Sequence, residues 1–348
     1  MAHDLMYRNG KHGMFCVGDR DAAWHKLGQR TPEAVTWAQA IELADLNWTV
    51  EKKQMYARNP LGKVVEIPLF GTFRSDDGAY LGGAVGEGYE VIQNKDAFTF
   101  CDSLLAVSDG AKYESAGALG VGGRIWVLAR IPEGDYVIDG GDAHKSYLMV
   151  ATSHDQTLSY VAKLVDTRVV CANTLAVAMG ERSTSFKIRH TASAKQRMDD
   201  ALLQLGEIKS TAMDLKSKME RLASRKLTRE SVDHILDRLF PKSTDDKANQ
   251  TRRDNTLTEV LSLYANNDRN AFPSVQGTAY NLLNAVTEYA DHFRTARGQG
   301  SKPEQVAVAR SESALFGSGA ALKTKALTVI LEETDQNTID AGIGYLDK

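Results

Sequence analysis

The spacing of hydrophobic residues changes near residue 194. Before that point apolar residues form short runs with period two, separated by Gly, Asn-Pro and Asp-Gly turns, which is typical of β-strands. Beyond it they recur three and four residues apart, which predicts helices that bury one face. The sequence therefore predicts an α+β fold. We expect a mainly antiparallel β-sheet domain with packed helices over residues 1–194, followed by a helical domain over residues 195–348.

The stretch 147–179 is the centre of the predicted sheet domain. Runs 147–152 and 158–165 are rich in β-branched and aromatic residues, and a short polar turn joins them, so they predict a β-hairpin. The run 168–179 places apolar residues three and four apart, which predicts a helix after the hairpin.

Other elements of this domain follow from local signals. Thr36 or Thr31 is a candidate cap for a helix ending near Ala44, and a short helix is predicted over residues 96–107. Further strands are predicted at 48–52, 64–74, 124–131 and 136–138. The glycine-rich piece 116–123 precedes a strand rather than a helix, so we interpret it as a turn and not as a dinucleotide-binding loop.

The second domain opens with a predicted amphipathic helix of about 28 residues from Met198, whose seam resembles that of a coiled coil. Such a helix can pair within its own chain or with a neighbour. Thr228 is expected to cap the next helix, without a full capping box. Further helices are predicted around 257–264, 278–297 and 313–331. The charged segment 242–254 is interpreted as a link and residues 332–348 as a polar tail.

Composition limits the class of protein. With 43% hydrophobic and 25% charged residues, and no run of about 18 apolar residues, we expect no transmembrane helix. The first residues have no apolar core of the secretory kind. Three cysteines without a CxxC pair argue against a disulfide framework or a cysteine zinc site, and favour a reducing cytoplasm.

A cluster of positive charge stands out against the formal net charge of −3. Residues 182–197 contain five cations, several Ser and Thr residues and no acid. Long cationic side chains among hydroxyls suit a nucleic-acid backbone, which needs neutralisation and hydrogen-bond donors along a line. An edge strand whose lysines prevent further strand pairing explains the same residues, so both interpretations stay open. The five cations are Arg182, Lys187, Arg189, Lys195 and Arg197.

Candidates for enzyme chemistry are weak. Cys171 and His154 are the nearest thiol and imidazole, yet an inert buried thiol is the commoner role for such a cysteine. Glu288, Asp291 and His292 share one helix face and could ligate a metal, but a solvated face explains them better. We therefore expect no catalytic residue, no metal and no cofactor, and favour a non-enzymatic protein.

Several separated motifs resemble one family. They are AWHKLG at 23–28, GYEVIQNKDAFTF at 88–100, SHDQT and RVVCANTL within 153–175, and NAVTEYADH at 284–292. Together they resemble the phage and plasmid-like protein family built on domain of unknown function 932, which implies a role in the DNA biology of mobile elements. The predicted architecture is also similar to that of single-strand annealing proteins of the RecT, Red-beta and Erf type. That similarity implies a homo-oligomeric ring or filament with DNA in a basic groove.

The leading hypothesis is a phage-type, oligomeric protein that binds single-stranded DNA and promotes annealing. Lys163 and Arg168 would join the five cations along the backbone, and Trp24 or Tyr160 would offer a stacking face for bases. One alternative is a structural or host-interaction protein of a mobile element. A second alternative is a metal- or thiol-dependent enzyme.

Overall fold

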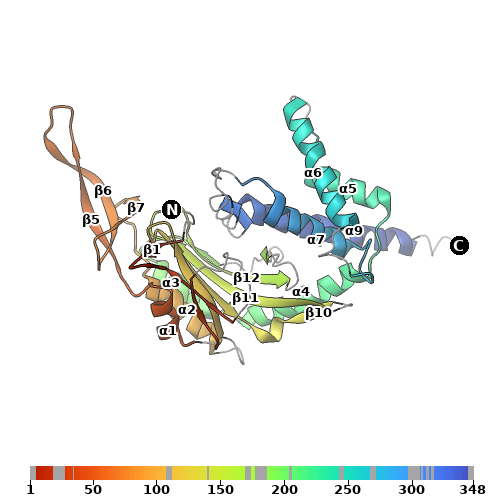
Figure 1. Ribbon diagram of the computed structural model, residues 1–348, viewed down its shortest axis with the longest axis horizontal. Coiled ribbons are helices and arrows are strands. Elements are labelled where there is room, and N and C mark those ends of the chain that lie inside the picture. Colours follow the sequence, from red (N-terminus) through yellow and green to blue (C-terminus); the bar gives the residue numbers. More distant parts are fainter. Residues whose placement is uncertain are drawn as a thin grey trace. The chain divides into compact units, whose positions relative to one another are not determined.

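The structure is a computed structural model (Figure 1). It describes residues 5–18, 28–33, 35–106, 112–138, 141–168, 174–176, 186–203, 206–242, 247–266, 272–296, 306, 309–310, 313–314 and 317–343. Strands dominate the first half of the chain and helices the second, so the predicted α+β class is confirmed.

The chain divides into two compact units, each assembled from separate segments. Unit 1 contains Met1–Gly134, Ser146–Leu164 and Met179–Thr211, and unit 2 contains Asp135–Lys145, Val165–Ala178 and Ala212–Lys348. The predicted boundary at residue 194 stays a prediction. The units differ from it because segments 135–145 and 165–178 group with the helices of unit 2, whereas residues 195–211 group with unit 1.

The main sheet has the strand order β13-β12-β11-β9-β8-β3-β4, with β10 beside β11 and β14 beside β12. The pair β3–β4 is parallel, and the other registers described are antiparallel. A separate small hairpin joins β1 (Tyr7–Arg8) to β2 (Lys11–His12). The strands of the main sheet are β3 (Met14–Val17), β4 (Gln29–Thr31), β8 (Lys112–Leu119), β9 (Arg124–Arg130), β10 (Tyr136–Ile138), β11 (Asp142–Ser153), β12 (Tyr160–Arg168), β13 (Thr174–Ala176) and β14 (Phe186–Ile188).

The central hairpin is confirmed, because β11 and β12 are neighbours in the sheet. The helix predicted over 168–179 is wrong where the structure describes that run. Residues Thr174–Ala176 form β13, which pairs with β12 so that Asp166 faces Leu175. A short apolar run fits both the helical and the strand period, and pairing with a neighbouring strand decides which structure forms.

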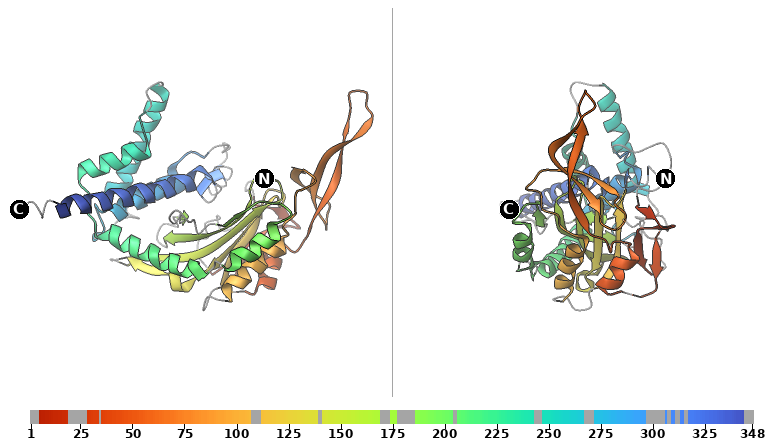
Figure 2. Two further views of the ribbon diagram at one scale, coloured as in Figure 1. Left: turned by 180° about the vertical axis from the view of Figure 1, so that it is seen from behind. Right: turned by 90° about the vertical axis from the view of Figure 1, so that its left-hand side faces the viewer.

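Three helices cover one side of the sheet in unit 1 (Figures 1 and 2): α1 (Trp37–Leu43), α2 (Asn94–Leu105) and α3 (Ala194–Leu203). Thr36 caps α1 with a full capping box, in which Thr36 Oγ1 accepts from the Gln39 backbone and Gln39 Oε1 accepts from the Thr36 backbone. Phe100 of α2 meets the Tyr160 ring edge-on at 5.5 Å between centroids. This contact shows which face of β12 the helices cover.

A second sheet of unit 1 contains β5 (Val50–Arg58), β6 (Val64–Arg74) and β7 (Tyr80–Val85). The predicted turns are confirmed. Asn59 Oδ1 accepts from the backbones of Leu61 and Lys63, and Gly78 takes a positive φ of 70° in the next turn. The glycine-rich piece also forms a turn, between β8 and β9, where Gly122 has φ 97°.

The helices of the second half are α4 (Gly206–Ser224), α5 (Arg229–Leu239), α6 (Lys247–Asn266), α7 (Ala279–Glu288), the π-helical turn η3 (Tyr289–Phe293) and α9 (Ser318–Ile343). The single long helix predicted from Met198 corresponds to α3 and α4, with residues 204–205 between them outside the described part. Thr228 caps α5 as predicted, by accepting from the Ser231 backbone. None of the described helices combines the length and apolarity that crossing a bilayer requires.

Two segments interpreted as polar link and tail are helical, so those predictions are wrong. Residues 247–254 belong to α6, where Arg253 pairs with Asp237 of α5 and donates to the Phe240 carbonyl. Residues 332–343 belong to α9, where Glu332 pairs with Arg238. Ion pairs between helices hold these segments, and an apolar pattern does not detect such pairs.

Helix α7 forms the centre of unit 2, since every residue from Ala279 to Glu288 is buried. The face with Glu288 and Asp291 is therefore not solvated, which corrects the sequence interpretation. Asp291 Oδ1 accepts from Lys323 Nζ of α9 at 2.5 Å, and Lys323 is fully buried. No cluster of His, Cys, Asp and Glu suited to a metal ion occurs in the described ranges.

Candidate nucleic-acid interface

Four of the predicted cations lie in one short segment of unit 1. Lys187 is on β14, Arg189 follows it, and Lys195 and Arg197 are in the first turns of α3. We call residues 187–197 the β14–α3 corner. Thr191 and Ser193 lie between the two cation pairs.

The direction of each cation follows from strand pairing and helix packing. Tyr160 pairs with Ile188, and both side chains are buried on the side that the helices cover. Lys187 pairs with Val161 and points to the opposite face, because side chains alternate along a strand. The chain then turns, with the Ala194 backbone donating to the Thr191 carbonyl, and enters α3. The cations therefore surround an edge where the sheet meets the helical layer, and do not line one trough.

His190 anchors the corner to the rest of unit 1. Its Nδ1 donates to the Glu90 carbonyl at 3.2 Å, so its Nε2 accepts from Thr152 Oγ1 at 3.2 Å. The ring stacks on Tyr89 with 4.8 Å between centroids and an interplanar angle of 6°. Burial lowers the pKa of His190, although backbone hydrogen bonds oppose the shift. The positive charge of the corner therefore comes from its lysines and arginines.

The corner cations have no acidic partner within the described part of the chain. Lys187, Arg189, Lys195 and Arg197 are all exposed, and none forms an ion pair with a described residue. Cations without a carboxylate partner keep their field available for an external anion. Along the chain the acid-free segment ends in the next turn of α3 at Asp199, and Glu90, whose backbone is hydrogen-bonded to His190, is a further exposed acid.

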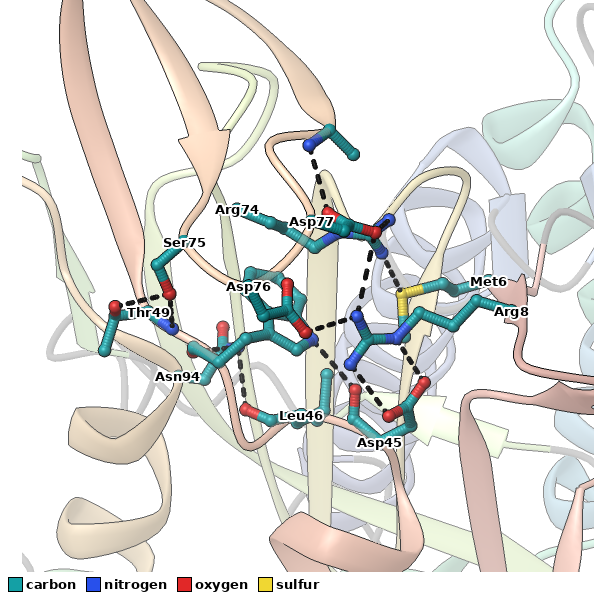
Figure 3. Close-up of polar contacts among 12 residues, drawn as sticks. Met6, Arg8, Asp45, Leu46, Thr49, Arg74, Ser75, Asp76, Asp77 and Asn94 are labelled. Carbon is teal, nitrogen blue, oxygen red and sulfur yellow. Dashed lines mark hydrogen bonds and ion pairs between the residues drawn. The ribbon is translucent and has the colours of Figure 1, made fainter.

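The arginines near the N-terminus show the contrasting arrangement (Figure 3). Arg8 forms a bidentate pair with Asp45, from Nε to Oδ2 at 2.5 Å and from Nη2 to Oδ1 at 2.8 Å, and a further pair with Asp76. Arg74 forms a bidentate pair with Asp77 at 3.0 and 2.6 Å. These guanidinium groups are compensated within the protein, so this cluster stabilises the fold and is no anion site.

The other predicted contact residues have different outcomes. Lys163 is half-buried on β12, on the same face as Val161 and therefore as Lys187. Tyr160 is completely buried, so it offers no face for a base to stack on and we do not retain it. Trp24, Arg182 and the side chain of Arg168 lie outside the described residues.

The edge-strand interpretation fits part of the corner. Among the described strands β14 pairs only with β12, so Lys187 lies on an edge strand, as that interpretation requires. It gives no reason for Lys195 and Arg197, which lie on a helix. The nucleic-acid interpretation accounts for both pairs.

The second histidine of unit 1 has a structural role. Asn94 donates through Nδ2 to the carbonyls of Leu46 and Trp48, so its Oδ1 accepts from His154 Nε2 at 2.9 Å (Figure 3 shows the Asn94 contact with Leu46). Complete burial lowers the pKa of His154 to about 3. The proposed thiol partner Cys171 lies outside the described residues.

Acid is expected to destabilise the protein through His154. Its folded pKa of about 3 lies below the ordinary value of 6.5, so the unfolded chain binds the proton first. The contribution of neutral His154 to the free energy of unfolding is fully present above pH 6.5. It decreases as the pH falls, by about 2 kcal/mol at pH 5. Urea unfolding at pH 7 and pH 5 measures this loss, and His154→Gln should reduce it. His234→Gln, which changes a histidine with a side chain 60% exposed, should behave like the wild type; equal pH dependence in all three proteins would contradict the assignment.

Unit 2 contains a buried polar network that no local pattern in the sequence indicates. His144 Nδ1 donates to Asp166 Oδ2 at 2.6 Å, and Tyr136 Oη donates to the same oxygen at 3.1 Å. Tyr280 of α7 donates to Asp142 Oδ2 at 2.7 Å and lies 2.6 Å from His144 Nε2. All five residues are at most 5% exposed, so the network is a structural connection between the ends of β-strands and α7.

A comparison with protein families decides the relationship. The family model of domain of unknown function 932 (DUF932) matches residues 82–315, more than half of the chain. The chain belongs to the DUF932 family. No curated protein and no solved structure matches it.

The DUF932 match includes both the β14–α3 corner and Tyr280. Two of its motifs meet in unit 1, where Asn94 of GYEVIQNKDAFTF binds His154 of SHDQT. The NAVTEYADH motif forms the end of α7 and the π-helical turn, with Asp291 bound to Lys323. In this chain these motif residues join segments that are far apart in the sequence.

Proposed function

We propose that this DUF932 protein binds single-stranded DNA at the β14–α3 corner and promotes annealing of complementary strands as an oligomer. We place this role in the DNA biology of a mobile element such as a phage. The observation that carries the proposal is the set of four exposed cations without an ion pair to any described residue. The proposal requires no catalytic side chain, metal or cofactor.

The β14–α3 corner offers hydrogen-bond donors to phosphates in addition to positive charge. Thr191 and Ser193 are exposed hydroxyl donors between the cation pairs. Helix α3 begins here, and the first backbone N–H groups of a helix are donors with a favourable dipole for an anion. Neutralising the phosphates of two strands lowers their repulsion. A strand held only by its backbone keeps its base edges free to pair.

Binding should depend strongly on salt. Four phosphate contacts on a single strand give a slope of about −3 in log affinity against log salt, or a loss of about 50-fold between 50 and 200 mM. Fluorescence anisotropy with a labelled oligonucleotide measures the slope, and a duplex competitor tests strand preference. Annealing is followed by the quenching of two complementary labelled strands. No binding at 50 mM salt, or affinity that does not change with salt, would refute the proposal.

A second candidate function is a structural protein that assembles through its own surface and binds no DNA. Exposed apolar side chains on the β5–β6 hairpin favour an interaction surface, with Leu61 83% and Val64 60% exposed. Assembly that proceeds identically without DNA, together with no retention of the oligonucleotide, would support this candidate over the first.

A further inference from the structure

The outer part of the β5–β6 hairpin has no third strand beside it. Strand β7 pairs with β6 only between Phe70 and Phe73, so residues 54–69 form a two-stranded ribbon among the described strands. We call these residues the β-arm. The views show it extending away from the other elements of unit 1 (Figures 1 and 2). A two-stranded hairpin has no core of its own and is marginally stable in water.

The β-arm concentrates exposed apolar surface. Of the eleven large apolar residues exposed in the described part of the chain, five belong to the arm. Such surface on open strands is typical of an interaction site. The five are Tyr56, Leu61, Val64, Val65 and Leu69, which are 59%, 83%, 60%, 39% and 37% exposed.

Strand register arranges four side chains of the arm in a square. Tyr56 pairs with Glu66 and Arg58 pairs with Val64, so these four project from the same face. Tyr56 and Val64 occupy one diagonal of the square, and Arg58 and Glu66 occupy the other. Neither Arg58 nor Glu66 forms an ion pair with a described residue.

We propose that this face of the β-arm is a homodimer interface and that its occupant is the β-arm of a second copy of the chain. A two-fold axis along the Tyr56–Val64 diagonal exchanges the positions of Arg58 and Glu66. Each Arg58 then meets the Glu66 of the second copy, while the apolar residues pair with their own symmetry mates. This is the self-complementarity that a two-fold interface requires.

Other occupants match the face less well. A phosphate backbone requires consistent positive charge, whereas this face pairs one cation with one acid beside two apolar groups. An unrelated protein has no need to satisfy the symmetric exchange of Arg58 and Glu66. The inference does not rest on DNA binding, because the β14–α3 corner lies on other elements.

Charge reversal tests the pairing in the full-length protein without DNA. Sedimentation velocity over about 1 to 100 μM should show a concentration-dependent dimer for the wild type. Arg58→Glu and Glu66→Arg each place like charges together twice, so each should raise the dimer dissociation constant at least about tenfold. The double variant R58E/E66R restores opposite charges and should regain most of the wild-type association.

Lys53→Glu provides the control, because Lys53 is exposed on β5 outside the arm and pairs with Glu51 of its own strand. It should leave the dimer unchanged. A wild type that stays monomeric, single reversals without effect, or a double variant that fails to regain association would each overturn the proposal. Circular dichroism checks the fold, and if a reversal unfolds the arm, Arg58→Gln and Glu66→Gln should each weaken the dimer about threefold; unchanged association would count against it.

Discussion

Alanine at Lys187, Arg189, Lys195 and Arg197 together is expected to lower the affinity for single-stranded DNA at least about 100-fold at 50 mM salt. The same variant should flatten the salt dependence, because the phosphate contacts that release counterions are gone. Since all four side chains are exposed, the fold should not change. Anisotropy titrations at 50, 100 and 200 mM salt measure both effects.

A matched control variant distinguishes the effect of the β14–α3 corner on DNA affinity from the effect of net charge. Lys216, Lys218, Arg221 and Arg229 lie on the surface of α4 and α5, and each pairs with an acid of unit 2. Alanine at these four positions also removes four positive charges, so both variants move the formal net charge from −3 to −7. The control should keep the wild-type slope of log affinity against log salt concentration. Equal losses in both variants would show that overall charge, and not the corner, governs binding.

His144→Ala is expected to destabilise unit 2 by about 3 to 5 kcal/mol, because it removes the ion-pair partner of the buried Asp166 carboxylate. Asp166 Oδ1 already has no hydrogen-bond partner among the described atoms, so the carboxylate would keep only the hydrogen bond from Tyr136 Oη to Oδ2. Urea or thermal unfolding followed by circular dichroism measures the change.

His234→Ala is the matched control for this prediction. His234 also pairs with an acid, Glu333, at 2.9 Å, but its side chain is 60% exposed whereas that of His144 is 4% exposed. Glu333 is buried, but the mostly exposed His234 imidazole stays in water, so the control should lose clearly less stability than His144→Ala. Similar losses for the two variants would contradict the structural role of the buried network.

Local signals in the sequence predicted local structure well. Thr36 caps α1, Asn59 shapes the hairpin turn, and the glycines before Arg124 form a turn and not a phosphate loop. In each case the residue acts on its own backbone or on neighbours a few positions away. The family motifs were also visible in the sequence, and the family match confirms the domain of unknown function.

Predictions failed where distant partners decide the outcome. The run containing Thr174–Ala176 pairs with β12 as a strand, against its helical spacing. The charged segments 247–254 and 332–343 are helical because residues such as Arg253 and Glu332 find partners on other helices. The buried network joins residues from Tyr136 to Tyr280, and nothing near any one of them in the sequence indicates the others.

The sequence by itself determined the α+β class, most turns and caps, and the position of an acid-free cationic segment. Only the tertiary structure decided that Lys187, Arg189, Lys195 and Arg197 surround a corner without described acidic partners, while Arg8 and Arg74 are neutralised. The physical reason is the distance along the chain over which each interaction acts. Hydrophobic period and capping act within a few residues of the chain, whereas the compensation of a charge depends on side chains that only folding brings near.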